Sequence, residues 1–188
     1  GHGFFISKTL YFPIASVNIL GKDIDSDLTS VKKEIGYLPS EVFYYSGMRA
    51  KDLLHYSASF YDVDCKERII ELAKYFELDL HMKIDKMSLG NKKKVGIIQG
   101  LIHNPKFIIL DEPTSGLDPV ARDNLLEVFQ SIVEDGNVSI LFSTHITSDL
   151  EKCADYITFI KEGNMVESCS KDDLLDKYRI VNGTKDQL

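Results

Sequence analysis

Phe107-Ile108-Ile109-Leu110-Asp111-Glu112 is the stretch of sequence that decides the fold. Its first four residues are the continuous apolar run that a strand buried on both faces of a sheet requires. In open α/β sheets the ligand crevice lies outside the carboxyl ends of the strands, which is where the two acids stand. An acid at that edge can hold Mg²⁺ at a phosphate site, and a second acid beside it can polarise an attacking water. The alternative is that the two acids merely end a strand and begin a turn.

The pattern around this stretch alternates between strands and helices, which predicts an α/β fold with a largely parallel sheet. Ser88 is a suitable N-cap for one helix, and Pro119 is well placed in the first turn of another. The middle of the chain, residues 41–104, has no convincing strand and is expected to be a helical insertion between residues 1–40 and 105–188. Strands are expected at 17–20, 35–38, 107–110, 155–160 and 165–166, with a further buried strand at 138–142 and a hairpin turn at 162–164. Helices are expected at 50–60, from an N-cap at Asp64 onward, at 88–103 and after Pro119, and the helix after Asp64 is expected to place Ile69, Ile70, Ala73 and Phe76 on one face.

Composition excludes several classes of protein. The chain has 188 residues, of which 44% are hydrophobic and 27% charged, so collagen-like, disordered and disulfide-scaffold interpretations are ruled out. A net charge of −7 makes broad nucleic-acid binding a poor hypothesis. The three cysteines, Cys65, Cys153 and Cys169, are far apart and form no C-x-x-C, as expected in a reducing compartment. No apolar run reaches the roughly 18 residues that a membrane span needs.

The acids are followed directly by a second informative stretch, Pro113-Thr114-Ser115-Gly116-Leu117-Asp118-Pro119. The combined string Leu-Asp-Glu-Pro-Thr-Ser-Gly-Leu-Asp-Pro closely resembles the Walker B motif and D-loop of ATP-binding cassette (ABC) ATPases. A ten-residue match of this kind is highly specific, and it raises the functional interpretation of Asp111 and Glu112 well above the turn alternative.

Upstream of these acids, residues 87–92 read Met-Ser-Leu-Gly-Asn-Lys and resemble a variant of the ABC signature, Leu-Ser-Gly-Gly-Gln. Ser88 and Gly90 match the pattern, whereas Leu89 and Asn91 depart from it. A serine hydroxyl and free amides at a helix N-terminus form an anion site. The simpler alternative is an ordinary serine N-cap. The lysines at 92–94 are interpreted by default as a solvated face.

Two further stretches resemble the same family. Residues 140–145, Ile-Leu-Phe-Ser-Thr-His, are similar to its strand and switch histidine, so His145 is the histidine expected to contact a γ-phosphate. Residues 35–39, Ile-Gly-Tyr-Leu-Pro, resemble the strand that enters the Q-loop. Ser40 stands where the family has glutamine, and the charged Glu41 follows. We therefore expect the Q-loop to lie at Ser40, but we do not assign to Ser40 the metal-binding role of the family's glutamine. The segment from Tyr44-Tyr45 to Phe60 would meet a membrane partner, or its tyrosines are ordinary packing residues.

A phosphate loop, G-x-x-x-x-G-K-[ST], does not occur in the sequence. Phe12 to Ile24 resembles the family's segment from the end of the following helix into the next strand, which would make Phe4 to Leu10 that helix. The loop would then belong near Gly1-His2-Gly3 or before it, with the first strands further upstream. Three explanations are open: a gene fragment, a loop left out of the sequence because it is disordered, or a naturally degraded ABC subunit. We expect the chain without this loop to bind ATP weakly.

The resemblance implies a P-loop NTPase (RecA-like) α/β fold with an inserted ABC helical subdomain, and an ATPase that uses ATP and Mg²⁺. It implies that Asp111 positions Mg²⁺, Glu112 is the general base and His145 contacts the γ-phosphate. Ser88 and Gly90 would reach the nucleotide of a second nucleotide-binding domain, and Asp118 would connect the two sites. A transmembrane permease would be the other partner, which predicts a cytoplasmic subunit bound peripherally to the membrane.

Two other functions remain as alternatives. A catalytically inactive or truncated ABC domain could act as a regulatory module. The missing loop, Ser40 and the altered signature favour this alternative, whereas the intact Asp111, Glu112 and His145 disfavour it. A soluble ABC ATPase for DNA repair or translation would need a coiled-coil insertion or a second cassette, and the sequence shows neither.

Overall fold

The computed structural model describes residues 17–41, 47–61, 64–134 and 136–178. Three predictions lie outside these residues: the helix at 4–10, the loop at 1–3 and the pair of tyrosines at 44–45.

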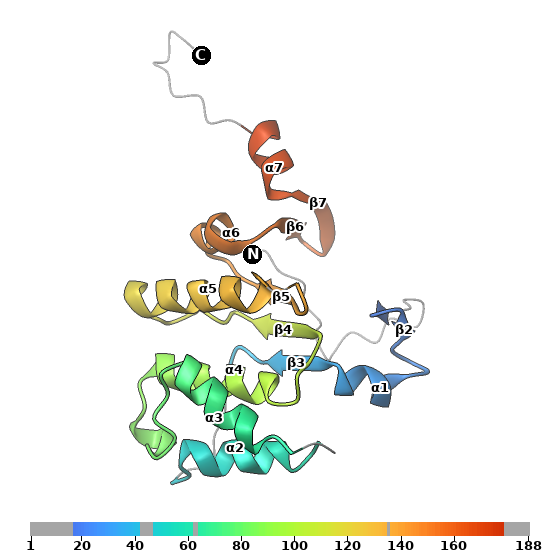
Figure 1. The fold of residues 1–188 in the computed structure, drawn as a ribbon. Helices are drawn as coiled ribbons and strands as arrows, with labels where there is room; N and C mark the ends of the chain where they lie inside the picture. Colours follow the sequence, from blue (N-terminus) through green and yellow to red (C-terminus); the bar gives the residue numbers. More distant parts are fainter. Residues whose placement is uncertain (1–16, 42–46, 62–63, 135, 179–188) are drawn as a thin grey trace.

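A parallel three-stranded sheet forms the centre of the fold, with the strand order β3-β4-β5 (Figure 1). In register, Leu38 pairs with Leu110, and Leu110 pairs with Phe142, so the three strands end at one edge. This edge is where the predicted crevice belongs. The α/β fold with a parallel sheet is therefore confirmed. The strands are β3 (Ile35–Leu38), β4 (Phe107–Asp111) and β5 (Ser139–Ser143).

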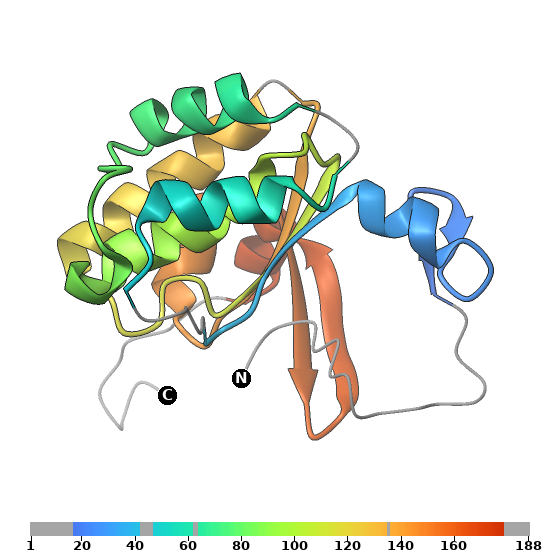
Figure 2. The ribbon, with the colours of Figure 1, turned by 90° about the horizontal axis from the view of Figure 1, so that it is seen from below.

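The regular elements among the described residues between β3 and β4 are helices joined by turns, apart from one isolated bridge between Arg49 and Lys83. Ser88 caps the last of these helices as predicted, because its hydroxyl accepts a hydrogen bond from the Asn91 amide at 3.3 Å. Figure 2 shows this helix beside the sheet, with two others packed outside it. The helices are α2 (Ala50–Ala58), α3 (Lys66–Tyr75), the short 3₁₀ helix η1 (Ile84–Lys86) and α4 (Leu89–Leu101).

Two details of the predicted helix at Asp64 were wrong. The N-cap position is Cys65, which makes no side-chain cap bond, and Asp64 instead accepts a hydrogen bond from the Lys66 amide at 3.0 Å. Ile70, expected on the buried face, is 63% exposed. The buried stripe of α3 follows Ile69, Leu72 and Ala73, a spacing of three to four residues that leaves Ile70 on the other side.

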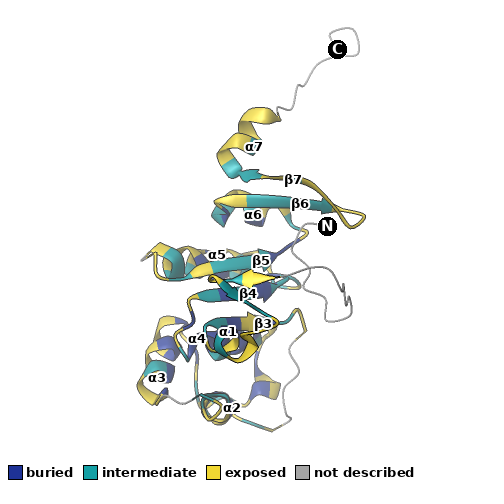
Figure 3. Ribbon diagram, turned by 90° about the vertical axis from the view of Figure 1, so that its right-hand side faces the viewer, coloured by how far each residue is buried: buried dark blue, intermediate teal, exposed yellow. Residues whose placement is uncertain are grey.

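One continuous core holds the helical segment against the sheet. The residues of this core come from α2, α3, α4, α5 (Pro119–Glu134) and the strands, and the ribbon of Figure 3 marks buried positions in dark blue. At Gly36 and Gly100 the backbones of β3 and α4 approach so closely that a Cβ on Gly36 would lie 2.3 Å from the Gly100 carbonyl oxygen. The division into a sheet core and a helical subdomain stays a prediction, but the two parts share their apolar interior.

The chain after β4 forms a long helix, a second helix beyond β5 and an antiparallel hairpin. The predicted turn at 162–164 is present, with Glu162 and Gly163 at φ 51° and 78°. Short helices before β3, after β5 and after the hairpin were not predicted. They have only six or seven residues each and too few apolar positions for a helical pattern. These elements are α5 (Pro119–Glu134), α6 (Thr147–Cys153), β6 (Tyr156–Lys161), β7 (Asn164–Ser170) and α7 (Lys171–Lys177), with β1 (Asn18–Ile19), β2 (Lys22–Asp23) and α1 (Leu28–Lys33) near the start.

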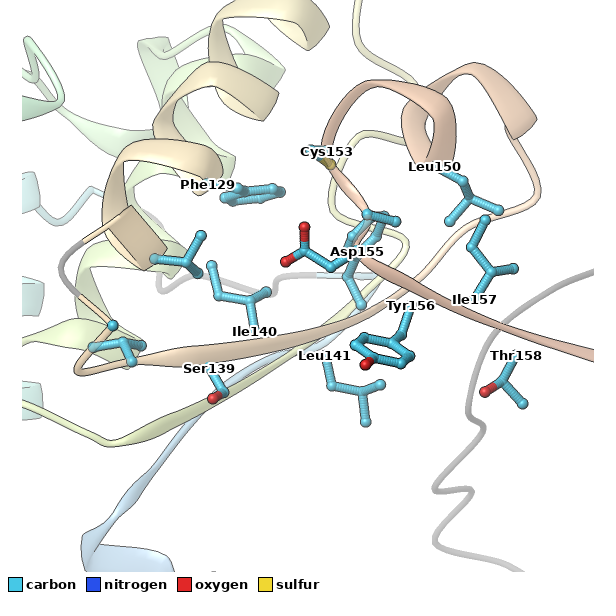
Figure 4. Close-up of a pocket in the computed structure, with 15 residues that line it drawn as sticks. Phe129, Ser139, Ile140, Leu141, Leu150, Cys153, Asp155, Tyr156, Ile157 and Thr158 are labelled. Carbon is cyan, nitrogen blue, oxygen red and sulfur yellow. The ribbon is translucent and has the colours of Figure 1, made fainter. Parts of the chain in front are cut away.

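A hollow of about 470 Å³ separates β5 from β6, which belong to different sheets. Ile140 and Leu141 of β5 line it from one side, Tyr156 and Ile157 of β6 line it from another, and Phe129 of α5 closes it (Figure 4). Ile140, Leu141 and Phe142 of β5 are therefore only half-buried, although the apolar run predicts a fully buried strand. The hollow contains none of the predicted site residues. Among the described residues, no helix is long and apolar enough to cross a membrane.

Candidate functional site

Asp111 and Ser143 stand side by side at the carboxyl edge of the sheet, as the last residues of β4 and β5. The Ser143 hydroxyl donates to Asp111 Oδ1 at 2.6 Å and accepts from the Glu112 amide at 2.9 Å. One buried hydroxyl therefore orients the carboxylate of the first acid and the backbone of the second. No role for Ser143 was predicted from the sequence, although its place directly before Thr144 and His145 puts it at this edge.

Glu112 leaves the sheet in a left-handed backbone conformation, with φ at 46°. This conformation costs a residue other than glycine about 1–3 kcal/mol, so the surrounding contacts must hold it in place. Its side chain turns towards His145, whose Nδ1 lies 2.9 Å from Glu112 Oε2. Because an ionised carboxylate only accepts hydrogen bonds, Nδ1 carries the proton in this pair. The two predicted catalytic side chains are thus in direct contact.

Lys93 corrects the interpretation of the lysine run as a solvated face. Its side chain is only 3% exposed, and Nζ donates to the Ser40 carbonyl at 2.8 Å and to the Glu112 carbonyl at 3.3 Å. Burial lowers the pKa of Lys93, while the charges of Asp111 and Glu112 oppose that shift. The sequence did contain a signal, because Lys93 precedes the buried Ile97 by four residues and so shares its face of α4.

An open hollow of about 590 Å³ brings several of the predicted residues together. Ser40, Glu112 and His145 line it, and Leu89 of the signature stretch lies on its wall. Lys92 and the two serines that line this hollow carry groups of the kind that bind phosphate oxygens. The complete lining is Ser40, Glu41, Leu89, Lys92, Lys93, Glu112, Ser115 and His145.

Ser88 and Gly90 flank Leu89 at the start of α4 but do not line this hollow. Ser88 acts as the N-cap of α4, so its simpler interpretation holds in this structure. A Cβ on Gly90 would meet Ala121 Cβ at 3.7 Å, an ordinary contact, so space within the chain does not require glycine there.

The D-loop residue Asp118 is the cap of α5. Its Oδ1 accepts a hydrogen bond from the Ala121 amide at 3.0 Å, and Pro119 begins the helix as expected. Gly116, two residues earlier, has φ at 76°, and a Cβ there would lie 3.0 Å from Leu89 Cδ2. This close approach packs the D-loop directly against the signature stretch.

Sequence analysis missed the buried acid Asp149, which is 0% exposed and joins three parts of the site. Thr114, after β4, donates to its Oδ2 at 2.6 Å, and the Thr144 hydroxyl lies 3.5 Å from the same oxygen. Arg122 Nε of α5 lies 3.1 Å from Oδ1, although its N–H is not aimed at that oxygen. Asp149 follows His145 by four residues, the one sequence hint that it belongs to this region.

A divalent metal would have few protein ligands at this edge. No group of three or more His, Cys, Asp or Glu side chains that could hold a metal occurs among the described residues. Mg²⁺ commonly binds one or two carboxylates together with waters and substrate phosphates, so a single Asp111 carboxylate fits that ion. A structural zinc site, which needs four protein ligands, does not fit the residues described.

The parallel sheet, the paired acids at its edge and the helical insertion define a nucleotide-binding domain of the P-loop NTPase class. The sequence pattern of the family described as ABC transporter matches residues 7–115, which is more than half of the chain. The chain therefore belongs to the ABC transporter family, as a nucleotide-binding domain. This finding confirms the resemblance and the fold inferred from the sequence.

Relatives named as transport proteins match this chain over different lengths. The bacitracin transport ATP-binding protein BcrA of Bacillus licheniformis is 30% identical over 165 residues, covering 87% of this chain and 54% of its own length. The lantibiotic transport ATP-binding protein SrtF of Streptococcus pyogenes is 45% identical over 83 residues, covering 44% of this chain and 36% of its own length. The chain spans about half the length of BcrA.

Solved structures show the same fold. One described as the ATP binding subunit of an ABC transporter has a TM-score of 0.73 and 26% identity, covering 86% of this chain and 69% of its own. The ATP-binding cassette MJ0796, described as a dimeric post-hydrolysis state bound to ADP and Pi, has a TM-score of 0.71. It is 20% identical and covers 82% of this chain and 72% of its own, and at that identity it supports the fold alone.

Proposed function

We propose that this chain is the ATP-hydrolysing part of an ABC transporter subunit that powers a separate membrane permease. The contact between Glu112 and His145, at 2.9 Å on the carboxyl edge of a parallel sheet, carries the proposal. A carboxylate held by a protonated ring nitrogen at a phosphate site is the arrangement that hydrolysis of a phosphoanhydride needs.

Each residue of this edge has a separate task in the proposal. Asp111 would hold Mg²⁺, whose charge helps to neutralise the transferring phosphoryl group. Ser143 fixes the direction of that carboxylate. Glu112 accepts a proton from the attacking water, and His145 holds the Glu112 carboxylate in place through Nδ1–H. The outer nitrogen of His145, Nε2, belongs to a ring that is 60% exposed, and it would bind the γ-phosphate when it also carries a proton, because phosphate oxygens only accept hydrogen bonds.

The signature and D-loop residues act across a dimer in this proposal. Ser88 and Gly90 lie at the start of α4, a helix of 13 residues. An anion from outside the chain can bind there, because the backbone amides of the first turn and the positive end of the helix dipole face it. Asp118 lies on the same side, because Gly116 and Leu89 pack the D-loop against α4. A second nucleotide-binding domain would bring its own ATP to Ser88 and Gly90, and Asp118 would connect the two sites.

The relatives support an exporter-type subunit that pairs with a permease. BcrA and SrtF are named for bacitracin and lantibiotic transport, and a third relative, LnrL of Bacillus subtilis, is named for linearmycin resistance. LnrL is 29% identical over 167 residues, covering 86% of this chain and 53% of its own length. Such a subunit would sit peripherally at the cytoplasmic face of the membrane through its permease.

A trapping experiment on the whole protein tests the dimer and separates it from the inactive-module alternative. Glu112→Gln should bind ATP, fail to hydrolyse it and accumulate as a dimer, so light scattering should show the mass double when Mg²⁺ and ATP are added. Glu134→Gln, an exposed acid at the end of α5, should stay monomeric under the same conditions. A Glu112→Gln protein that stays monomeric in saturating ATP would favour the inactive regulatory module.

A further inference from the structure

We propose that Lys93 is a positioning residue, which holds Glu112 through its backbone carbonyl and couples α4 to the catalytic edge. This inference rests on the proposed function, because it assigns Lys93 a part in the hydrolysis that Glu112 promotes. The family signature gave no reason to single out this lysine from the two that flank it.

Lys93 joins three elements that are distant in the sequence. It projects from the first turns of α4, and its ammonium reaches the carbonyls of Ser40, beyond β3, and of Glu112, beyond β4, at 2.8 and 3.3 Å. These carbonyls lie at the carboxyl ends of two adjacent parallel strands. One side chain therefore clamps the two loops on which the site is built.

The burial of Lys93 shows that this clamp is a fixed part of the structure. A lysine side chain normally keeps its ammonium in water, and burying it without hydrogen-bond partners is costly. Lys93 is only 3% exposed, whereas Lys92 and Lys94 on either side are half-exposed. The two carbonyls satisfy the buried ammonium, and the carboxylates of Asp111 and Glu112 add a favourable charge interaction.

The consequence for Glu112 follows from its backbone. Its N–H donates to Ser143, and its C=O accepts from Lys93 at 3.3 Å and from the Ser115 amide at 3.2 Å, so the left-handed residue is held at both ends. With both ends fixed, the carboxylate meets His145 at 2.9 Å. If the contact from Lys93 is lost, the Glu112 carbonyl keeps the bond from the Ser115 amide in the same turn but loses its tie to α4. The carboxylate is then held less firmly in the direction in which it meets His145.

The same side chain connects the signature stretch to Glu112, the proposed general base. Ser88 caps α4 only five residues before Lys93, so both belong to one rigid helical segment. A shift of the α4 N-terminus when it binds a nucleotide is then transmitted to the Glu112 carbonyl. The link is made by a lysine on the helix, whereas Ser40, in place of the family's glutamine, contributes only its backbone carbonyl.

Steady-state ATP hydrolysis by the whole protein tests this role, with Lys93→Met as the main variant because methionine has a similar length and donates no hydrogen bond. We expect kcat to fall about 10–100-fold while KM changes less than about twofold, since the contact acts on the base. Lys93→Gln keeps an amide donor and should lose less. Lys94→Met, which removes only the bond to the Phe76 carbonyl, is the matched control and should keep kcat within about twofold.

The same substitutions in a Glu112→Gln background separate positioning from general structural damage. If Lys93 acts through the Glu112 carboxylate, Lys93→Met should reduce the residual single-turnover rate less than about twofold there. The proposal is overturned if Lys93→Met lowers the single-turnover rate in the Glu112→Gln background as much as it lowers kcat in the wild-type background. It is also overturned if Lys93→Met leaves kcat unchanged in the wild-type background. If Lys93→Met does not fold, Lys93→Gln is judged by the same two criteria.

A second readout does not depend on turnover. Because Glu112 binds the His145 ring, the ring resonances of His145 in an NMR spectrum should move in Lys93→Met towards their positions in Glu112→Gln, and stay in place in Lys94→Met. If Glu112→Gln leaves hydrolysis intact, the proposed function fails, yet the NMR shift still supports the clamp on Glu112. An unmoved His145 resonance in Lys93→Met contradicts the clamp whatever the hydrolysis assay gives.

Discussion

Ser143 Oγ lies 2.6 Å from Asp111 Oδ1, so the last residue of β5 orients the carboxylate at the end of β4. The same hydroxyl accepts the Glu112 amide at 2.9 Å. Both contacts are possible because parallel strands in register end together, which places Ser143 directly beside Asp111. The register of the sheet thus determines the geometry of the two acids.

Removing this hydroxyl should impair the site without disturbing the fold around it. Ser143→Ala leaves the Glu112 amide unpaired and Asp111 free to rotate, and we expect ATP turnover to fall about 10-fold or more, since a hydrogen bond to a charged group contributes about 1.5–3 kcal/mol. The Mg²⁺ concentration at half-maximal turnover should rise as well. Ser139→Ala, at the exposed start of the same strand, is the control. An unchanged Mg²⁺ dependence would show that Ser143 does not orient Asp111.

Asp149 should be important for stability because it is a buried acid with several partners. Asp149→Ala leaves the Thr114 hydroxyl without its acceptor and the Arg122 guanidinium without its buried counter-charge, and breaking a buried ion pair costs about 3–5 kcal/mol. Denaturation in urea measures this loss in the free energy of unfolding. Asp123→Ala, which removes an exposed partner of Lys152 at 3.2 Å, should cost less than about 1 kcal/mol. Equal losses in the two variants would contradict this account of Asp149.

The close approach of β3 and α4 gives a second stability prediction. Gly36→Ala would place a methyl group 2.3 Å from the Gly100 carbonyl oxygen, so the strand and the helix must move apart. Overpacking of this kind costs about 1–3 kcal/mol, and more where the neighbour is backbone that cannot yield. Gly90→Ala, whose new methyl would make only ordinary contacts, is the matched substitution and should leave the thermal midpoint within a few degrees. Equal thermal midpoints for Gly36→Ala and Gly90→Ala would show that β3 and α4 can accommodate a methyl group at position 36.

His103 should make the fold sensitive to mild acid. Its ring stacks on Tyr61 with centroids 4.1 Å apart, and its Nε2 lies 3.1 Å from the Ile35 carbonyl oxygen, to which it donates. Nδ1 is buried without a hydrogen-bond partner, so a proton placed there would find no acceptor. Burial accordingly lowers the pKa of His103, more than the bond to Ile35 raises it.

The sign of the pH effect follows from that shift. As the pH falls through about 6.5, the unfolded chain takes up a proton on His103 that the folded chain resists, so the free energy of unfolding decreases. The slope cannot exceed about 1.4 kcal/mol per pH unit for one proton. His103→Phe keeps an aromatic ring but cannot titrate, and the difference in slope between wild type and variant, measured by urea unfolding from pH 8 to pH 5, isolates this residue. Parallel slopes would contradict the assignment.

The sequence predicted the parts of the site that depend on local pattern. The apolar run of β4 with its two acids, the capping serine of α4 and the histidine after β5 are each recognisable within a few residues, and the parallel sheet then brings their ends together. Lys93 and Asp149 were not predictable in this way, because their partners come from strands and helices that meet only in the folded chain. The helical spacing indicates that Lys93 lies on the buried face of α4, but its acceptors are identified only in the folded chain.

The short elements were missed for a related reason. Helices such as α6 and α7 have seven residues each, too few for an apolar period to be recognised, and they are held by contacts to their neighbours. The exposure of Ile70 has the same origin, because the helix partners of α3 determine which of its faces is covered.

ATP hydrolysis by the whole protein with Glu112→Gln tests the central claim most directly, namely that Glu112 is the base of an ATPase. Glutamine has the same shape but cannot take up the proton of the attacking water, so turnover should fall by at least about 100-fold while ATP still binds. Glu134→Gln should hydrolyse ATP at the wild-type rate. Hydrolysis by Glu112→Gln at a rate close to that of the wild type would contradict the account.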